Sequence, residues 1–163
     1  MVGEKMIKKK EELKLNLGCG FRKMIEPGWV NIDNRAELNP DVVCDVTEGL
    51  PYEESSVDYV KCFDFLEHIP TDKVISLVEE IYRVLKPGGI FESFTPDAEF
   101  GMGGFQDFHH KSFWVENSWL YFSDTDHRVL YGIKANFEIV SMNRTENKPL
   151  RIYHLHVIAK ARK

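Results

Sequence analysis

The sequence lacks several features that would assign the chain to a common class of protein. It has three cysteines, Cys19, Cys44 and Cys62, without the spacing of a metal or redox motif. No apolar run approaches the roughly 20 residues of a membrane span, and the charged start has no apolar signal-peptide core. The formal net charge of -5 argues against nucleic acid as a partner, since nucleic-acid binders are usually basic. These absences predict reduced thiols, no membrane contact and a cytoplasmic location.

The composition is that of an ordinary globular chain. With 163 residues, 43% of them hydrophobic and 29% charged, the sequence predicts one domain over residues 1–163. It contains no internal repeat. Residues 1–12 form a charged N-terminal arm, in which Lys8–Lys10 precede Glu11 and Glu12. We expect a solvated lead-in there rather than a basic arm that binds an anionic partner.

A glycine turn near the N-terminus organises the rest of the chain. Residues 13–17 alternate apolar and polar side chains and then break at Gly18-Cys19-Gly20, which predicts a strand running into a tight turn. Residues 29–33 read as a second short strand, which ends in Asp33. A simple turn that binds no ligand would also contain such a pair of glycines. A glycine turn after one strand and an acid after the next are nevertheless typical of a nucleoside site in an open α/β sheet.

The same turn argues against a dinucleotide ligand. Lys23 stands where the dinucleotide fingerprint has its third glycine. Only residues 21–26 separate the turn from Pro27-Gly28, too few for the long helix whose N-terminus holds a pyrophosphate. A nucleoside without phosphates fits better.

The following residues predict a mainly parallel sheet. Strands are expected at residues 41–46, 55–63 and 90–95, with an amphipathic helix over residues 71–86 that ends at Pro87-Gly88-Gly89. The last part, residues 136–142 and 150–160, predicts two strands joined by a short polar turn. Such strands must be antiparallel.

Five motifs in this order resemble the class I S-adenosylmethionine-dependent methyltransferases. They are Leu15-Asn16-Leu17-Gly18-Cys19-Gly20, Asn31-Ile32-Asp33, Cys44-Asp45-Val46, residues 62–70 around Leu66-Glu67-His68, and residues 83–89 around Leu85-Lys86-Pro87-Gly88-Gly89. The chain is most similar to short members with a Pro-Gly-Trp-Val-Asn-Ile-Asp stretch in place of a long first helix. The resemblance implies a Rossmann-like α/β fold with a mainly parallel sheet, an antiparallel C-terminal hairpin and a first helix that is short or missing. It implies S-adenosylmethionine as the cofactor and S-adenosylhomocysteine as the product.

Carried over position by position, the resemblance implies a set of cofactor contacts. The Gly18-Cys19-Gly20 turn would lie against the amino-acid end of the cofactor, with Asn16 supporting the turn. Asp33 would bind the ribose diol. Phe63 and Asp64 would border the methionine moiety and the methyl group.

The adenine would meet Asp45 and Val46, although Asp45 could instead cap the loop at residues 47–48. Because the long first helix is missing, Arg22 or Lys23 could hold the cofactor carboxylate. A cleft that carries Asp33, Asp45, Asp64 and Glu67 would also attract the sulfonium cation.

The expected function is therefore methyl transfer to an O or N atom of an unidentified small-molecule acceptor. His109 and His110 are the candidate catalytic residues, because a base of near-neutral pKa suits deprotonation of a hydroxyl or amine. His68 is interpreted as a structural or pocket-wall histidine, and His154 and His156 as hairpin surface or interface rather than ligands. No metal site is expected, and the alternative would be a site built from Asp107, His109 and His110.

Two alternative functions stay open. A cofactor-binding scaffold or partner subunit would have a filled pocket beside the methyl group, and a dinucleotide oxidoreductase would need the missing third glycine. The segment of residues 96–131 is rich in aromatic residues and opens with glycines, which suits a lid. Its aromatic residues could equally line a substrate pocket, form the face of a homodimer or belong to the core.

Overall fold

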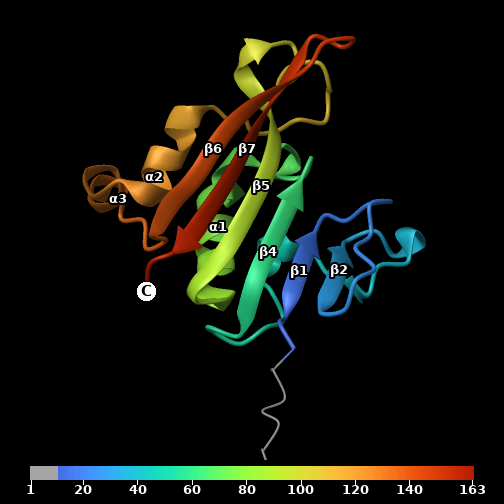
Figure 1. Cartoon of the computed structure of the whole chain (residues 1–163), viewed down its shortest axis with the longest axis vertical. Coiled ribbons are helices and arrows are strands. Elements are labelled where there is room, and N and C mark those ends of the chain that lie inside the picture. The colour runs from blue at the N-terminus through green and yellow to red at the C-terminus, as the bar shows by residue number, and fades with distance from the viewer. Residues whose placement is uncertain (1–10) are drawn as a thin grey trace, which may run out of the picture.

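One sheet of seven strands runs through residues 11–163, the part of the chain that the computed structural model describes (Figure 1). The strand order is β3-β2-β1-β4-β5-β7-β6. The strands are β1 (Lys14–Leu17), β2 (Trp29–Asp33), β3 (Val42–Val43), β4 (Val57–Phe63), β5 (Leu85–Gly101), β6 (Phe137–Asn147) and β7 (Ile152–Ala161). The first five pair in parallel, and β7 pairs antiparallel with both β5 and β6. The predicted fold class is confirmed.

Three strands differ most from their predicted bounds. β6 continues past the predicted residue 142 to Asn147, because its pairing with β7 runs as far as Ile152. β3 is only two residues long, because Asp45 turns the chain into a 3-10 helix, η2 (Val46–Glu48), instead of continuing the strand. β5 extends on both sides of the predicted residues 90–95, since its long partner β7 provides hydrogen bonds as far as Gly101.

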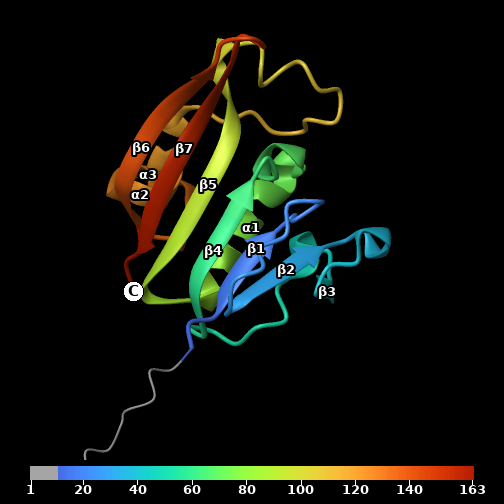
Figure 2. The same cartoon turned by 45° about the vertical axis from the view of Figure 1, so that its right-hand side comes forward.

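The α-helices lie on one face of the sheet (Figures 1 and 2). They are α1 (Thr71–Val84), α2 (Leu120–Ser123) and α3 (Thr125–Tyr131). α1 buries Leu77, Val78, Ile81 and Val84, which recur at helical spacing and pack against the buried side chains of the sheet. This contact between helix and sheet forms the core that carries the carboxyl ends of the strands.

The crossovers between the first strands contain no α-helix. Residues 18–28 form a turn and a loop, and the next two connections contain only the 3-10 helices η1 (Ala36–Leu38) and η2. The connection from β4 to β5 contains η3 (Leu66–His68) followed by α1. The expected absence of the first helix is confirmed. On the side of the sheet away from α1, long side chains such as Lys61 and Phe63 are half-buried, with the Lys61 ammonium 4.1 Å from the Phe63 ring centroid.

The aromatic segment of residues 96–131 divides into a buried and an exposed part. Trp114, Trp119 and Phe122 are buried in the core, where η4 (Glu116–Trp119) and α2 place them. Phe105 stacks on Phe113 at 4.8 Å between ring centroids, and both rings are exposed. The core interpretation therefore applies only to the second half of the segment.

Two further expectations concern the charged N-terminal arm and membrane-spanning segments. Residues 1–10 of the charged arm lie outside the described residues. Among the residues described, no helix is both long enough and apolar enough to cross a membrane.

Gly18 allows a test of how tightly the turn is packed. Its φ of +62° disfavours any side chain, and an added Cβ would lie 2.0 Å from Cδ2 of Phe65. Gly132 has a φ of +67° with open space around it. We expect Gly132→Ala to lower the free energy of unfolding by about 1–2 kcal/mol, the cost of the left-handed conformation. Gly18→Ala should lose a further ~1–3 kcal/mol from overpacking.

Urea unfolding measures both variants. Adding Phe65→Ala to Gly18→Ala should recover part of the extra loss, because it removes the ring that the new methyl group meets. Equal losses for the two single variants would show that Phe65 does not press on the turn.

Candidate active site

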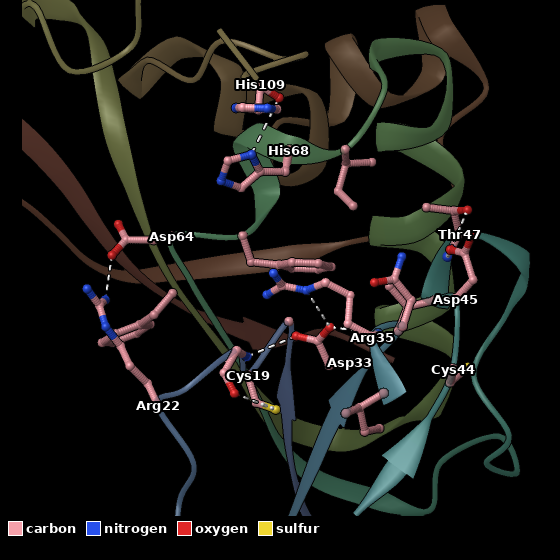
Figure 3. Close-up of a pocket in the computed structure, with 18 of the residues that line it drawn as sticks. Cys19, Arg22, Asp33, Arg35, Cys44, Asp45, Thr47, Asp64, His68 and His109 are labelled. Carbon is pink, nitrogen blue, oxygen red and sulfur yellow. Dashed lines mark hydrogen bonds and ion pairs between the residues drawn. The ribbon is translucent and has the colours of Figure 1, made fainter. Parts of the chain in front are cut away.

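The strand register brings the predicted site residues to one edge of the sheet. Leu17 pairs with Ile32 of β2 and with Cys62 of β4, so the residues that follow each of these strands lie at the same level. There they surround a cavity of about 710 Å³ (Figure 3). Eight of the nine predicted cofactor-binding residues line it: Gly18, Cys19, Gly20, Asp33, Asp45, Val46, Phe63 and Asp64.

Asn16, the ninth, lies beneath the turn. Its side-chain amide donates to the carbonyl of Arg22 at 2.9 Å and to Oδ1 of Asn31 at 3.0 Å. It is buried and does not line the cavity. These contacts agree with the expectation that Asn16 supports the turn.

Asp33 joins the glycine turn to the end of β2. Its Oδ2 accepts a hydrogen bond from the backbone N–H of Gly20 at 2.9 Å, and the residue is only 6% exposed. Its Oδ1 accepts from the backbone N–H of Arg35 at 3.0 Å. A carboxylate offers about four acceptor positions, so the same group can still accept from a diol.

Arg35 is a site residue that sequence reasoning missed. Its Nε lies 3.4 Å from Oδ1 of Asp33, and the side chain is 55% exposed (Figure 3). A ligand that hydrogen-bonds to Asp33 must therefore displace the Arg35 guanidinium or share the carboxylate with it. The only signal in the sequence is an arginine two residues after the strand-end acid.

Asp45 combines the two interpretations that the sequence left open. It lines the cavity, and it also caps η2, since its Oδ1 accepts from the amide of Thr47 at 3.0 Å and from its hydroxyl at 2.8 Å. These hydrogen bonds, the hydroxyl first, lower the pKa of the Asp45 carboxyl below its ordinary value.

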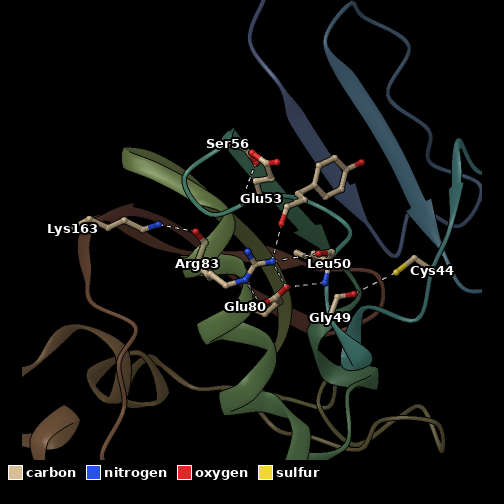
Figure 4. Close-up of polar contacts among 9 residues, drawn as sticks. Cys44, Gly49, Leu50, Glu53, Ser56, Glu80, Arg83 and Lys163 are labelled. Carbon is tan, nitrogen blue, oxygen red and sulfur yellow. Dashed lines mark hydrogen bonds and ion pairs between the residues drawn. The ribbon is translucent and has the colours of Figure 1, made fainter.

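An ion pair on α1 holds the loop that follows η2 (Figure 4). Glu80 and Arg83 are 2.6 Å apart; Glu80 accepts from the amide of Leu50 at 2.8 Å, and Arg83 donates to the carbonyl of Tyr52 at 2.9 Å. The hydrogen bond from Arg83 keeps the pKa of Glu80 below its ordinary value. The side of the cavity that Asp45 lines is thus fixed to the core helix.

The opposite side of the cavity is built on the left-handed residue Asp64. With a φ of +48°, Asp64 turns the chain out of β4, and its carboxylate lies 2.5 Å from Nη1 of Arg22. Lys23 instead donates its ammonium to the carbonyl of Asn39 and does not line the cavity. Of the two cations considered for the cofactor carboxylate, Arg22 is therefore the one in position.

A second cavity of about 520 Å³ adjoins the first. Arg22, Asp64, His68 and Asp107 line both cavities. His109 faces the first cavity and His110 the second. The two predicted catalytic histidines are thus separated by the wall that the cavities share.

Glu67, which the sequence places among the acids of the cleft, and His154, which it places on the hairpin, both line the second cavity. Burial raises the pKa of Glu67 to about 8, helped by the charges of Asp64 and Asp107. His154 stacks on Phe94 at 4.5 Å between ring centroids, and burial lowers its pKa. The hairpin-surface interpretation is wrong for His154, because β7 directs it toward Asp64, 3.6 Å away.

Comparison with known proteins connects part of this chain to a family. Residues 15–92 match the family model described as a methyltransferase domain. These residues belong to the methyltransferase domain family. The match contains the glycine turn, Asp33, Asp45 and Asp64, and it ends within β5. No curated protein matches the sequence.

Solved structures share the fold across the rest of the chain. A Burkholderia thailandensis 1,6-didemethyltoxoflavin N1-methyltransferase, solved with its substrate and S-adenosylhomocysteine, is 16% identical, with a TM-score of 0.66 over 93% of this chain and 71% of that one. A methyltransferase from Archaeoglobus fulgidus is 15% identical, with a TM-score of 0.68 over 91% and 86%. One from Methanosarcina mazei is 17% identical, with a TM-score of 0.62 over 94% of each chain. Both are described as S-adenosylmethionine-dependent.

These findings support three expectations from the sequence. The methyltransferase domain match over residues 15–92 and the shared fold support a class I S-adenosylmethionine-dependent methyltransferase, an enzyme, with S-adenosylmethionine as its cofactor.

Asp33 offers a direct test of the first cavity. We expect Asp33→Asn to weaken S-adenosylhomocysteine binding about 10- to 100-fold, because a hydrogen bond to a charged group contributes roughly 1.5–3 kcal/mol. Isothermal titration calorimetry measures the affinity. Glu37→Gln, the same charge change at an exposed position on η1, is the control and should bind as the wild type does. An unchanged affinity for Asp33→Asn would remove Asp33 from the binding site.

Proposed function

We propose that the enzyme transfers the methyl group to an O or N atom of a small molecule held in the second cavity. The observation that carries this proposal is the pair of adjoining cavities with a common polar wall. The first cavity carries the residues of the methyltransferase motifs, which leaves the second for the acceptor. Its lining includes carboxylates, histidines and an amide, which suits a polar acceptor. The neighbour that methylates a nitrogen of a toxoflavin precursor is an example of such chemistry on this fold.

The residues around the first cavity fit the cofactor. Gly20 leaves its part of the turn open, since the nearest atom to a Cβ added there would be Nη2 of Arg35, at 3.8 Å, whereas Gly18 packs against the Phe65 ring. We assign the ribose diol to Asp33 and the amino-acid end to the Gly18-Cys19-Gly20 turn. The cofactor carboxylate is assigned to Arg22.

The remaining assignments follow the two sides of the cavity. Asp45 and Val46 would meet the adenine, and Phe63 and Asp64 would border the methyl group. Asn16 supports the turn without touching the cofactor.

When bound, the cofactor supplies an electrophilic methyl group on a sulfonium. The chain then has to orient the acceptor atom, which can contribute roughly 7–11 kcal/mol, and to keep water out. We assign acceptor binding to His110, whose side chain is 6% exposed and whose Nδ1 is fixed by the carbonyl of Gly104 at 2.9 Å. His109 is 87% exposed and lies 2.9 Å from Asp107, which suits passing the acceptor's proton to solvent.

The alternatives weighed from the sequence are less well supported. A non-catalytic scaffold would have side chains filling the space beside the methyl group, whereas here a second cavity opens there. A dinucleotide enzyme would need a helix after the glycine turn, and residues 18–28 form none.

The proposal also covers the domain organisation, the compartment and the oligomeric state. We propose that residues 1–163 act as one domain, with residues 96–131 as the substrate segment. Three free cysteines suit a reducing, cytoplasmic compartment. We also propose a homodimer that forms through the exposed aromatic residues of the segment 96–131.

Transfer of a radiolabelled methyl group tests the proposed acceptor class. The enzyme is incubated with methyl-labelled S-adenosylmethionine and, separately, with the small-molecule, protein and nucleic-acid fractions of a cell extract. We expect label in the small-molecule fraction, and none with Asp33→Asn at limiting cofactor. Label that appears only in protein or nucleic acid would contradict the proposal.

A further inference from the structure

Three side chains at the wall between the two cavities converge in a way that methyl transfer alone does not require. Glu67, His68 and His110 each offer a ligand atom, and these atoms lie within 4.8 Å of one another. All three residues line the second cavity, and His68 also lines the first. Among the described residues, this is the one group of three such side chains whose ligand atoms lie this close together.

Glu67 is the strongest part of the group. The residue is 2% exposed, and its Oε2 is buried without a hydrogen-bond partner among the residues described. A buried, unpaired carboxylate is costly, and buried charges in proteins are usually paired or coordinate metals. The backbone is also held in place, since the carbonyl of Glu67 accepts from the amides of Lys111 at 2.7 Å and Ser112 at 3.1 Å. The carboxylate is therefore fixed at this position and aimed at the histidines.

His110 has the arrangement of a metal ligand. Its Nδ1 donates to the carbonyl of Gly104 at 2.9 Å, which leaves Nε2 as the nitrogen with a free lone pair. A ligating histidine almost always donates its other ring N–H to a carbonyl or carboxylate in this way. Oδ2 of Asp107 lies 4.0 Å from that Nε2. The His68 ring lies 5.1 Å from the His110 ring between centroids.

We propose that Glu67, His68 and His110 bind a divalent transition-metal ion at the wall between the cavities. Two imidazoles and one carboxylate suit zinc, iron or cobalt better than magnesium or calcium, which prefer oxygen ligands alone. Three protein ligands leave coordination positions open to the second cavity. An acceptor oxygen bound there would be oriented toward the first cavity, and its hydroxyl pKa would be lowered. This role rests on the proposed function and favours an oxygen acceptor, whereas the ion site itself does not depend on it.

The site differs from the expectation drawn from the sequence. The sequence predicts no metal site, and the alternative set of metal ligands that it offers is Asp107 with His109 and His110. The structure turns His109 away, since its Nδ1 lies 2.9 Å from Oδ1 of Asp107, and brings in Glu67 and His68 from the segment after β4 instead.

Cobalt provides a test with a readout other than activity. The purified chain is stripped with a chelator and titrated with Co²⁺, whose visible absorption reports direct coordination by nitrogen and oxygen. We expect one Co²⁺ per chain, and a loss of affinity of more than about tenfold in Glu67→Gln and in His110→Gln. The control is His127→Gln, a partly exposed histidine on α3 beside Asp124, which should bind Co²⁺ as the wild type does.

Titration of the same samples with S-adenosylhomocysteine separates the two proposals. The Glu67→Gln and His110→Gln variants should keep their S-adenosylhomocysteine affinity within about twofold, and this also shows that they fold. If wild-type chain binds S-adenosylhomocysteine but no Co²⁺, the metal site is wrong and the proposed function stands. Co²⁺ binding that is equal in all four proteins would also overturn the site.

Discussion

The hydrogen bond from the Gly20 amide to the Asp33 carboxylate joins the ends of β1 and β2, and the shape of the first cavity depends on it. One oxygen of Asp33 holds the glycine turn while the other holds the amide of Arg35. A single buried acid therefore fixes both walls of the cleft. Because parallel pairing places the ends of β1, β2 and β4 at one level, Asp64 then lies across from the same turn. The cofactor site follows from this register.

The missing first helix is compensated by side chains under the turn. Asn31 accepts from the amide of Met24 at 2.8 Å and donates to its carbonyl at 2.9 Å, so that it holds the loop as a paired strand would. Asp41 accepts from the backbone and side chain of Asn31, both at 2.7 Å, and these bonds, the backbone one first, lower the pKa of Asp41. The buried Asn16 and Asn31 thus hold the loop between β1 and β2 in place.

The aromatic segment ties the second cavity to the core. The hydroxyl of Thr71, at the start of α1, donates to the carbonyl of Lys111 at 2.8 Å, and the hydroxyl of Ser112 donates to that of Leu66 at 2.9 Å. The segment is therefore anchored beside η3, next to Glu67 and His68. A fixed segment can hold an acceptor in one orientation.

The sequence predicted the strands, α1, the final hairpin and eight cofactor-motif residues that line the first cavity, because each has a local signal. Gly18, Gly20 and Asp33 are recognised by their place after a strand. The parts it missed depend on contacts between distant segments. Nothing near Glu67 in the chain shows that it is buried without a partner, since the residues that enclose it come from residues 104–112 and from β5 and β7. Arg35 was missed for the same reason, because its role depends on where its side chain folds back.

A crystal structure with S-adenosylhomocysteine tests the central claim most directly. The account predicts the nucleoside in the cavity at the ends of β1, β2 and β4, with the ribose hydroxyls on Asp33 and the Arg35 side chain moved aside. The sulfur should face the second cavity. A nucleoside bound elsewhere, or an Asp33 carboxylate still closed by Arg35 with the ligand present, would contradict it.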